Sequence, residues 1–175
     1  EVGVKPDVYS FNGVISAFAK QSNARAAHDV LDSMHKFDVS ANLVSYNAVM
    51  SAYMNEDKFR MANKLFDQMT AQNIKPDIVT HNAFISACVE KGTPEMAEAS
   101  YQRLVDSNLR ADAITYTSMV HVHGNSGNCT KAFEWLNKMR EANFGPPRDC
   151  FQILVNGLAK TARGDDAAVA ATDES

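Results

Sequence analysis

A repeat of 35 residues is the feature that most constrains the fold of this chain. Asparagine recurs at Asn12, Asn47 and Asn82, and an aromatic or imidazole side chain precedes each of them. A second series places a small side chain at the same interval, at Ala27, Ala62, Ala97 and Ala132. Self-similarity with a period of about 20–50 residues is typical of proteins that stack one supersecondary unit many times. The sequence therefore predicts a repeat architecture.

The two series also place the repeat boundaries. Complete repeats are expected at residues 8–42, 43–77, 78–112 and 113–147, with a partial fifth repeat at 148–162. Residues 1–7 end in Lys-Pro-Asp, as the second repeat does, and resemble the tail of a preceding repeat. Residues 163–175 are rich in Ala and Asp and are expected to form a capping or flexible tail. We therefore expect the natural protein to be longer.

Each repeat has the apolar pattern of two helices. In the first part of the first repeat, Phe11, Ile15 and Phe18 are spaced so that they share one face of a helix. The second part carries another apolar stripe, which includes Leu31 and Met34. The two parts are separated by helix-breaking residues, for example the segment 124–128 with its two glycines.

A single helical hairpin of this kind cannot bury both of its apolar stripes, so neighbouring hairpins are expected to stack. We predict an all-α fold, a right-handed α-solenoid of 35-residue helix-turn-helix repeats.

The repeats resemble those of the pentatricopeptide repeat family. The resemblance lies in the segments VTHNAFISA at 79–87, ANKLFDQM at 62–69 and NIKPD at 73–77, and it covers roughly residues 1–160. A tetratricopeptide array has the same hairpin plan, but its repeat is one residue shorter and its Trp and Leu-Gly markers are absent here. The resemblance implies sequence-directed binding of single-stranded RNA, one base per repeat, in mitochondria or plastids.

The resemblance also implies which residues contact RNA. In that family, the fifth residue of a repeat and its last residue read the edge of one base together. The pairs here are Asn12 with Asn42, Asn47 with Asp77, Asn82 with Asp112, and Thr117 with Pro147. The second residue of each repeat is implied to sandwich the base, which assigns that role to Tyr9, Val44, Val79 and Ile114. By the family's pairing rules, the expected target is pyrimidine-U-U-purine.

Positive charge is scarce where the family contacts phosphate. A lysine near the end of each first helix commonly meets the RNA backbone, and only Lys20 and Lys160 keep the charge in this chain. The formal net charge of -4 supplies no general attraction for phosphates. Pro147 offers no side-chain hydrogen bond to a base.

Two structural alternatives remain open for the polar residues. The asparagines can cap a helix or bridge adjacent repeats without any ligand. Asp77 and Asp112 can stabilise the first turn of the following helix. The whole array can also act as a scaffold that binds protein partners within a larger organellar assembly, such as a ribosome or a membrane complex.

The sequence offers little for catalysis or cofactor binding. His121 and His123 are two residues apart on an expected helix and so point to different faces, which makes a poor metal pair. Asp165 and Asp166 lie in the weak tail, and no glycine-rich phosphate loop is present. Three cysteines without a C-x-x-C pair indicate neither a disulfide framework nor a zinc site. We expect no enzyme, no metal, no cofactor and no membrane-spanning segment.

Overall fold

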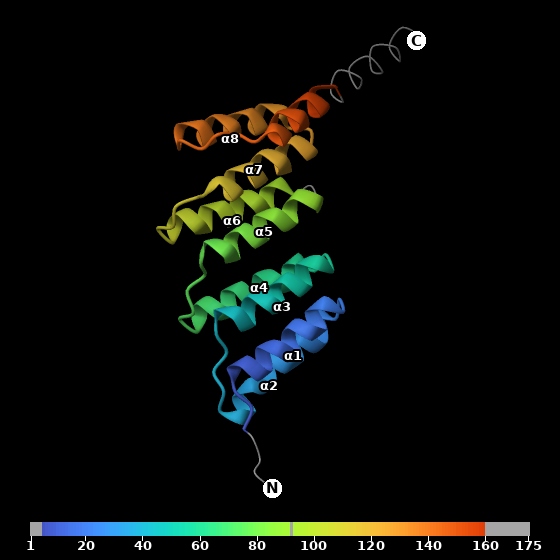
Figure 1. The fold of residues 1–175 in the computed structure, drawn as a ribbon, viewed down its shortest axis with the longest axis vertical. Coiled ribbons are helices and arrows are strands. Elements are labelled where there is room, and N and C mark those ends of the chain that lie inside the picture. Colours follow the sequence, from blue (N-terminus) through green and yellow to red (C-terminus); the bar gives the residue numbers. More distant parts are fainter. Residues whose placement is uncertain (1–4, 92, 160–175) are drawn as a thin grey trace, which may run out of the picture. The chain divides into compact units, whose positions relative to one another are not determined.

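The computed structural model describes residues 5–91 and 93–159, and every regular element in these two segments is a helix (Figure 1). The elements are α1 (Val8–Lys20), α2 (Ala24–Ser33), the 3₁₀ turn η1 (Met34–Phe37), α3 (Leu43–Asn55), α4 (Phe59–Ala71), α5 (Ile78–Lys91), α6 (Pro94–Asp106), α7 (Ala113–Asn125) and α8 (Cys129–Glu141). A further helical segment occupies residues 148–159. The all-α prediction is confirmed, and the hand of the stacking stays a prediction.

The helices end at turns that recur with the period of the sequence. Residues with left-handed backbone angles end the first helices, at Ser22, Asp57 and Gly127. A second set, at Asp38, Asn73, Asn108 and Asn143, ends the second part of each hairpin. The residue after each turn donates back to the helix, as Ile74 N does to Met69 O at 3.0 Å. This bond pattern satisfies carbonyl groups that a helix end otherwise leaves without partners.

The chain divides into two compact blocks, residues 1–80 and 81–175. In the first block, α1 packs on α2 and α3 on α4, and α3 also contacts α1 and α2. In the second block, α7 packs on α8 and contacts α6. Figure 1 shows the paired helices of each hairpin running side by side. Each block is therefore a stack of helical hairpins.

Small side chains allow the helices to approach closely. Ala27, Ala62, Ala97 and Ala132 are all fully buried. Gly124 belongs to α7 rather than to the turn, and a methyl group added there would collide with the side chain of Ile153. The expected helix breaker at 124–128 is therefore shorter, because the left-handed turn begins only at Gly127.

Some sequence predictions concern residues outside the described segments. Lys160, the tail at 163–175 with Asp165 and Asp166, and residues 1–4 lie there. Within residues 5–91 and 93–159, no helix combines the length and the apolar character needed to cross a bilayer.

Candidate nucleic-acid interface

The last residue of each of the first three expected repeats caps the first helix of the next one. The backbone nitrogen of Ser45 donates to Asn42 Oδ1 at 3.1 Å, and the matching bonds from Thr80 to Asp77 and from Thr115 to Asp112 measure 2.8 and 2.9 Å. The backbone nitrogens of Asn42, Asp77 and Asp112 donate in turn to the hydroxyls of these residues. Each helix start is thus a capping box in which Ser or Thr replaces the usual Glu or Gln. The helix-boundary role considered for the aspartates is present in the structure.

The same hydroxyls connect one repeat to the asparagine of the repeat before it. Ser45 Oγ donates to Asn12 Oδ1 at 2.6 Å, Thr80 Oγ1 to Asn47 Oδ1 at 3.0 Å, and Thr115 Oγ1 to Asn82 Oδ1 at 2.7 Å. The bridging role considered for the asparagines is therefore present as well. Sequence reasoning missed Ser45, Thr80 and Thr115, although Ser or Thr recurs there with the 35-residue period.

Two of the predicted base-reading pairs are joined by direct hydrogen bonds. Asn82 Nδ2 donates to both carboxylate oxygens of Asp112, at 3.0 and 3.2 Å. Asn12 Nδ2 donates to Asn42 Oδ1 at 3.4 Å. A carboxylate only accepts hydrogen bonds, so the NH₂ group of Asn82 must face Asp112 and its carbonyl must face Thr115. The amide orientation is fixed from both sides.

Hydrogen bonding keeps Asp112 ionised. Burial alone would raise the pKa of its carboxyl, but hydrogen bonds from the backbone of Thr115 and from the side chains of Asn82 and Thr115 outweigh burial and lower that pKa. Asp112 therefore carries a negative charge near neutral pH and presents acceptors only.

An exposed apolar side chain lies three residues before each reading position. The exposed fraction is 80% for Tyr9, 58% for Val44, 63% for Val79 and 59% for Ile114. Residues three apart share a helix face, so each apolar group lies beside the polar residue of its own repeat. Large apolar side chains on the surface next to fixed hydrogen-bonding groups are suited to contact the flat face of a base.

The fourth repeat differs from the first three. Thr117 replaces the asparagine, Pro147 replaces the capping residue and Cys150 replaces the hydroxyl. Thr117, Ile114 and Pro147 line a small cavity of about 330 Å³, together with Gly145 and Met139. The three residues implied to meet the fourth base are therefore brought together without the hydrogen-bond network of the other repeats.

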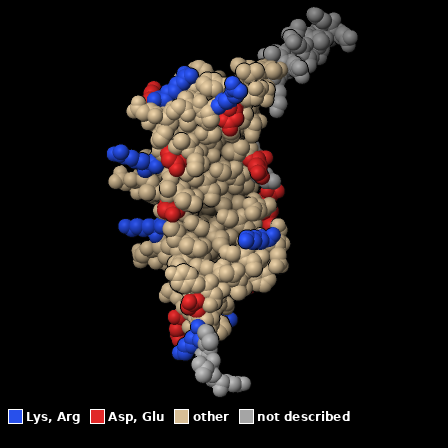
Figure 2. Space-filling model, in the orientation of Figure 1, with Lys and Arg blue, Asp and Glu red and all other residues tan. Residues whose placement is uncertain are grey.

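The described lysines give no continuous basic track. Lys20 is exposed at the place expected for a phosphate contact, but Asn55, Glu90 and Asn125 occupy the matching positions of the next three repeats. Asn125 donates instead to the backbone of Val89 at 3.2 Å. On the face drawn in Figure 2, basic side chains are scattered among acidic ones and do not form one patch.

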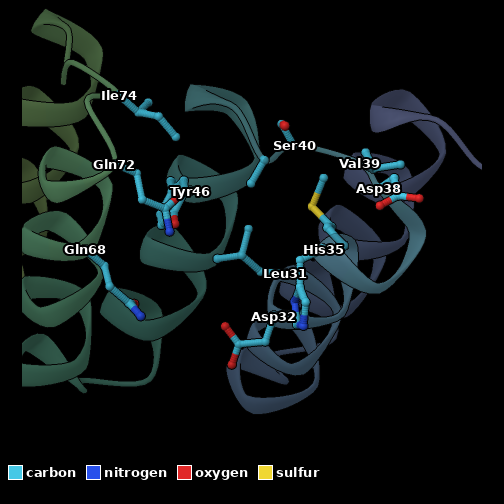
Figure 3. Close-up of a pocket in the computed structure, with 12 residues that line it drawn as sticks. Leu31, Asp32, His35, Asp38, Val39, Ser40, Tyr46, Gln68, Gln72 and Ile74 are labelled. Carbon is cyan, nitrogen blue, oxygen red and sulfur yellow. The ribbon is translucent and has the colours of Figure 1, made fainter.

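A larger cavity lies elsewhere in the first block. This depression of about 970 Å³ is lined by residues of α2, η1 and α4 and by Tyr46, and the side chains of Asp32, His35 and Gln68 are among those around it (Figure 3). None of the residues expected to contact RNA lines it. It is thus separate from the candidate interface.

Comparisons with known proteins bear on the family. A family model described as the PPR repeat family matches residues 41–90, 76–125 and 111–160, and one described as the pentatricopeptide repeat domain matches residues 1–56. No curated protein sequence matches the chain closely enough to count as a relative.

Solved structures give the same fold. The pentatricopeptide repeat protein PPR10 from maize superposes with a TM-score of 0.81 at 24% identity, over 96% of this chain and 24% of that one. PPR10 in complex with an 18-nt psaJ RNA element gives 0.76 at 25% identity, over 97% of this chain and 25% of that one. The PPR domain of Arabidopsis thaliana protein-only RNase P 1, in complex with tRNA, gives 0.72 at 17% identity, over 90% of this chain and 83% of that one.

The chain spans about a quarter of the length of the PPR10 structures that it matches. Since the repeat models together account for residues 1–160, the protein belongs to the pentatricopeptide repeat family.

Proposed function

We propose that this chain binds single-stranded RNA and reads one base with each of its four complete repeats, with the preference pyrimidine-U-U-purine. The observation that carries the proposal is the fixed amide in the first three repeats. Asn12, Asn47 and Asn82 each accept a hydroxyl hydrogen bond from the next repeat and lie beside an exposed apolar side chain. PPR10 has been solved with bound RNA, which supports the same class of ligand here.

The third repeat explains the preference for uracil in physical terms. The Asn82 amide directs its NH₂ group away from Thr115 and toward Asp112, so a base oxygen that approaches this group meets a hydrogen-bond donor. The Asp112 carboxylate accepts only, so it favours a base edge with a hydrogen to donate. Uracil offers both an N3–H donor and flanking carbonyl acceptors, whereas the N3 of cytosine carries no hydrogen.

Stacking supplies the rest of the affinity. A base stacked on protein contributes roughly 1–3 kcal/mol, so four bases give about 4–12 kcal/mol before ordering costs. A micromolar dissociation constant corresponds to about 8 kcal/mol. We infer binding in the micromolar range for this chain, as part of organelle RNA metabolism, with no catalytic step of its own.

Fluorescence anisotropy with short labelled RNAs at low salt tests the proposal. The pair to compare contains C-U-U-A in one RNA and C-G-G-A in the other. We expect binding to the first to be at least about tenfold tighter, a difference of about 1.4 kcal/mol. Equal affinity for the two RNAs would contradict base reading. The salt dependence should be shallow, because each phosphate contact adds only about −0.7 to the slope and few lysines are available.

One surface feature favours a second candidate, a helical-repeat scaffold that binds protein partners. Phe151, Val155 and Leu158 lie on one stripe of the helix at 148–159 and are 41, 60 and 57% exposed. Exposed apolar stripes of this kind suit contact with another protein. Failure to bind either RNA at concentrations on the order of tens of micromolar would favour this candidate.

A further inference from the structure

Three side chains with metal-ligating atoms meet where α7 packs against the start of the helix at 148–159. His121 Nε2 lies 3.5 Å from Asp149 Oδ2 and 4.0 Å from Cys150 Sγ. One ligand atom from each of the three residues lies within 4.8 Å of the other two. The sequence suggests only His123 as a partner for His121, and the structure gives His121 different neighbours, 28 and 29 residues further on.

The spacing of these atoms is close to that of a tetrahedral zinc site. Zinc bonds of about 2.0–2.1 Å to nitrogen or oxygen and about 2.3 Å to sulfur place neighbouring ligand atoms about 3.4–3.6 Å apart. The imidazole-to-carboxylate distance already has this value, and the imidazole-to-sulfur distance exceeds it by a few tenths of an ångström. Asp149 is mostly exposed, so it can rotate toward an ion and leaves an entry path from solvent.

The three residues combine burial with access from solvent. Cys150 is buried, His121 is half-buried and Asp149 is exposed. A bound divalent cation supplies the positive charge that makes the thiolate favourable, and the thiol proton leaves to solvent.

The cluster lies where the earlier junctions have hydroxyl side chains. Cys150 occupies the place of Ser45 and Thr80, and His121 occupies the place of Ser86 in the preceding repeat. Thr117 also hydrogen-bonds to the Cys150 thiol. The fourth junction thus has nitrogen, sulfur and oxygen ligands where the earlier junctions have hydroxyls.

We propose that His121, Asp149 and Cys150 form a site for a divalent transition-metal ion, zinc in the first place, that ties α7 to the helix at 148–159. A set of one imidazole, one thiolate and one carboxylate suits zinc or cobalt, whereas magnesium and calcium prefer oxygen ligands alone. A water molecule completes the four ligands. The site joins two neighbouring repeats in place of the missing capping box, and it does not depend on RNA binding.

Cobalt absorption tests the site directly, because a thiolate bound to Co²⁺ gives a near-ultraviolet charge-transfer band and a tetrahedral ion gives strong visible bands. The reduced, metal-free chain is titrated with CoCl₂ and then with ZnCl₂. We expect one Co²⁺ per chain with both sets of bands, and loss of the bands as Zn²⁺ displaces Co²⁺.

Matched variants assign the ligands. Cys150→Ser introduces serine, which the second repeat has at the equivalent position, Ser45. This variant should abolish the charge-transfer band. His121→Ser introduces the residue that the preceding repeat has at Ser86, and it should weaken Co²⁺ binding at least about tenfold, since loss of a residue that merely orients a ligand already costs about 10–100-fold. Cys129→Ser is the control and should keep the wild-type spectrum. Circular dichroism checks that each variant is helical.

Thermal unfolding gives a second readout. Zn²⁺ should raise the melting temperature of the wild-type chain and of Cys129→Ser, and should leave that of Cys150→Ser unchanged, because an ion that binds only the folded state stabilises it. Absence of the charge-transfer band in the wild-type chain at excess Co²⁺, or its persistence in Cys150→Ser, would overturn the proposal and leave these residues as a hydrogen-bonded cluster only.

Discussion

The hydroxyl of Thr115 donates a 2.7 Å hydrogen bond to the side-chain carbonyl of Asn82, which belongs to the preceding repeat. Thr115 is fully buried and Asn82 nearly so, and the same hydroxyl also lies 2.9 Å from Asp112 Oδ1. The backbone nitrogen of Thr115 donates to Asp112 Oδ1 at 2.9 Å as well, and this bond caps α7. One residue of a repeat therefore holds both the cap of its own helix and the amide that is proposed to meet the base.

Thr115→Val tests this arrangement because valine keeps the shape and removes the hydroxyl. We expect the free energy of unfolding in urea to fall by about 1–3 kcal/mol, since the Asn82 carbonyl is left without its buried donor. The preference of the third repeat for uracil over cytosine should fall about fivefold, as expected for the loss of one hydrogen bond worth about 1 kcal/mol. Anisotropy with RNAs that differ only at that base measures this ratio.

Thr115→Ser is the control, because serine supplies the hydroxyl at the equivalent place in the second repeat. It should keep the base preference and most of the stability. A valine variant that loses stability and keeps the full uracil preference would show that the hydroxyl serves folding alone.

Gly124 and Gly13 form a pair with opposite expected effects. Both lie inside first helices, but a methyl group at Gly124 would meet Ile153, whereas Gly13 has no neighbouring atom within 4 Å of that position. Gly124→Ala should lower the free energy of unfolding by about 1–3 kcal/mol through overpacking. Gly13→Ala should raise it by about 0.5–1 kcal/mol through helix propensity. Equal changes in the free energy of unfolding, measured by urea denaturation, would show that Gly124 does not lie in close contact with Ile153.

The stability of the chain should depend on the charge of Asp112 in acid. Its pKa in the folded chain lies below the ordinary value of 3.8, so ionised Asp112 stabilises the fold above that pH, and the contribution disappears as the pH falls through the lowered pKa. Asp112→Asn keeps the cap but loses the charge, and at pH 7 it should cost about 0.3–1 kcal/mol. The difference between the two proteins should shrink between about pH 5 and about pH 2. A constant difference over this range would exclude a role for the charge.

The family and the helical class could be predicted from the sequence because they rest on local patterns. Asn12, Asn47 and Asn82 set the phase, and alanines such as Ala62 and Ala97 mark places where helices touch, which the structure shows as fully buried. Such periodic patterns can be recognised in a single sequence because each repeat contacts mainly its neighbours, so the same packing positions recur in every repeat.

The contacts between repeats could not be predicted in the same way. The bond from Thr115 to Asn82 depends on how one hairpin stacks on the next, and nothing in either residue alone indicates it. The contact between His121 and Cys150 could not be predicted for the same reason, because the two residues are 29 positions apart in the chain and approach each other only when the hairpins stack. The sequence pattern places Gly124 in a helix breaker, and only the position of Ile153 shows that it is needed for close packing.

The most direct test of the central claim is to change the code of one repeat and ask whether the preferred base follows. Asn47→Thr with Asp77→Asn keeps a residue at position 77 that can cap α5, and the family's pairing rules assign the new pair to adenine. Wild-type and variant chains are titrated with two RNAs, C-U-U-A and C-A-U-A, which differ only at the base assigned to the second repeat. Our account predicts that the wild type prefers the first and the variant the second, each by about tenfold or more. An identical preference in both proteins would contradict the claim that Asn47 and Asp77 read that base.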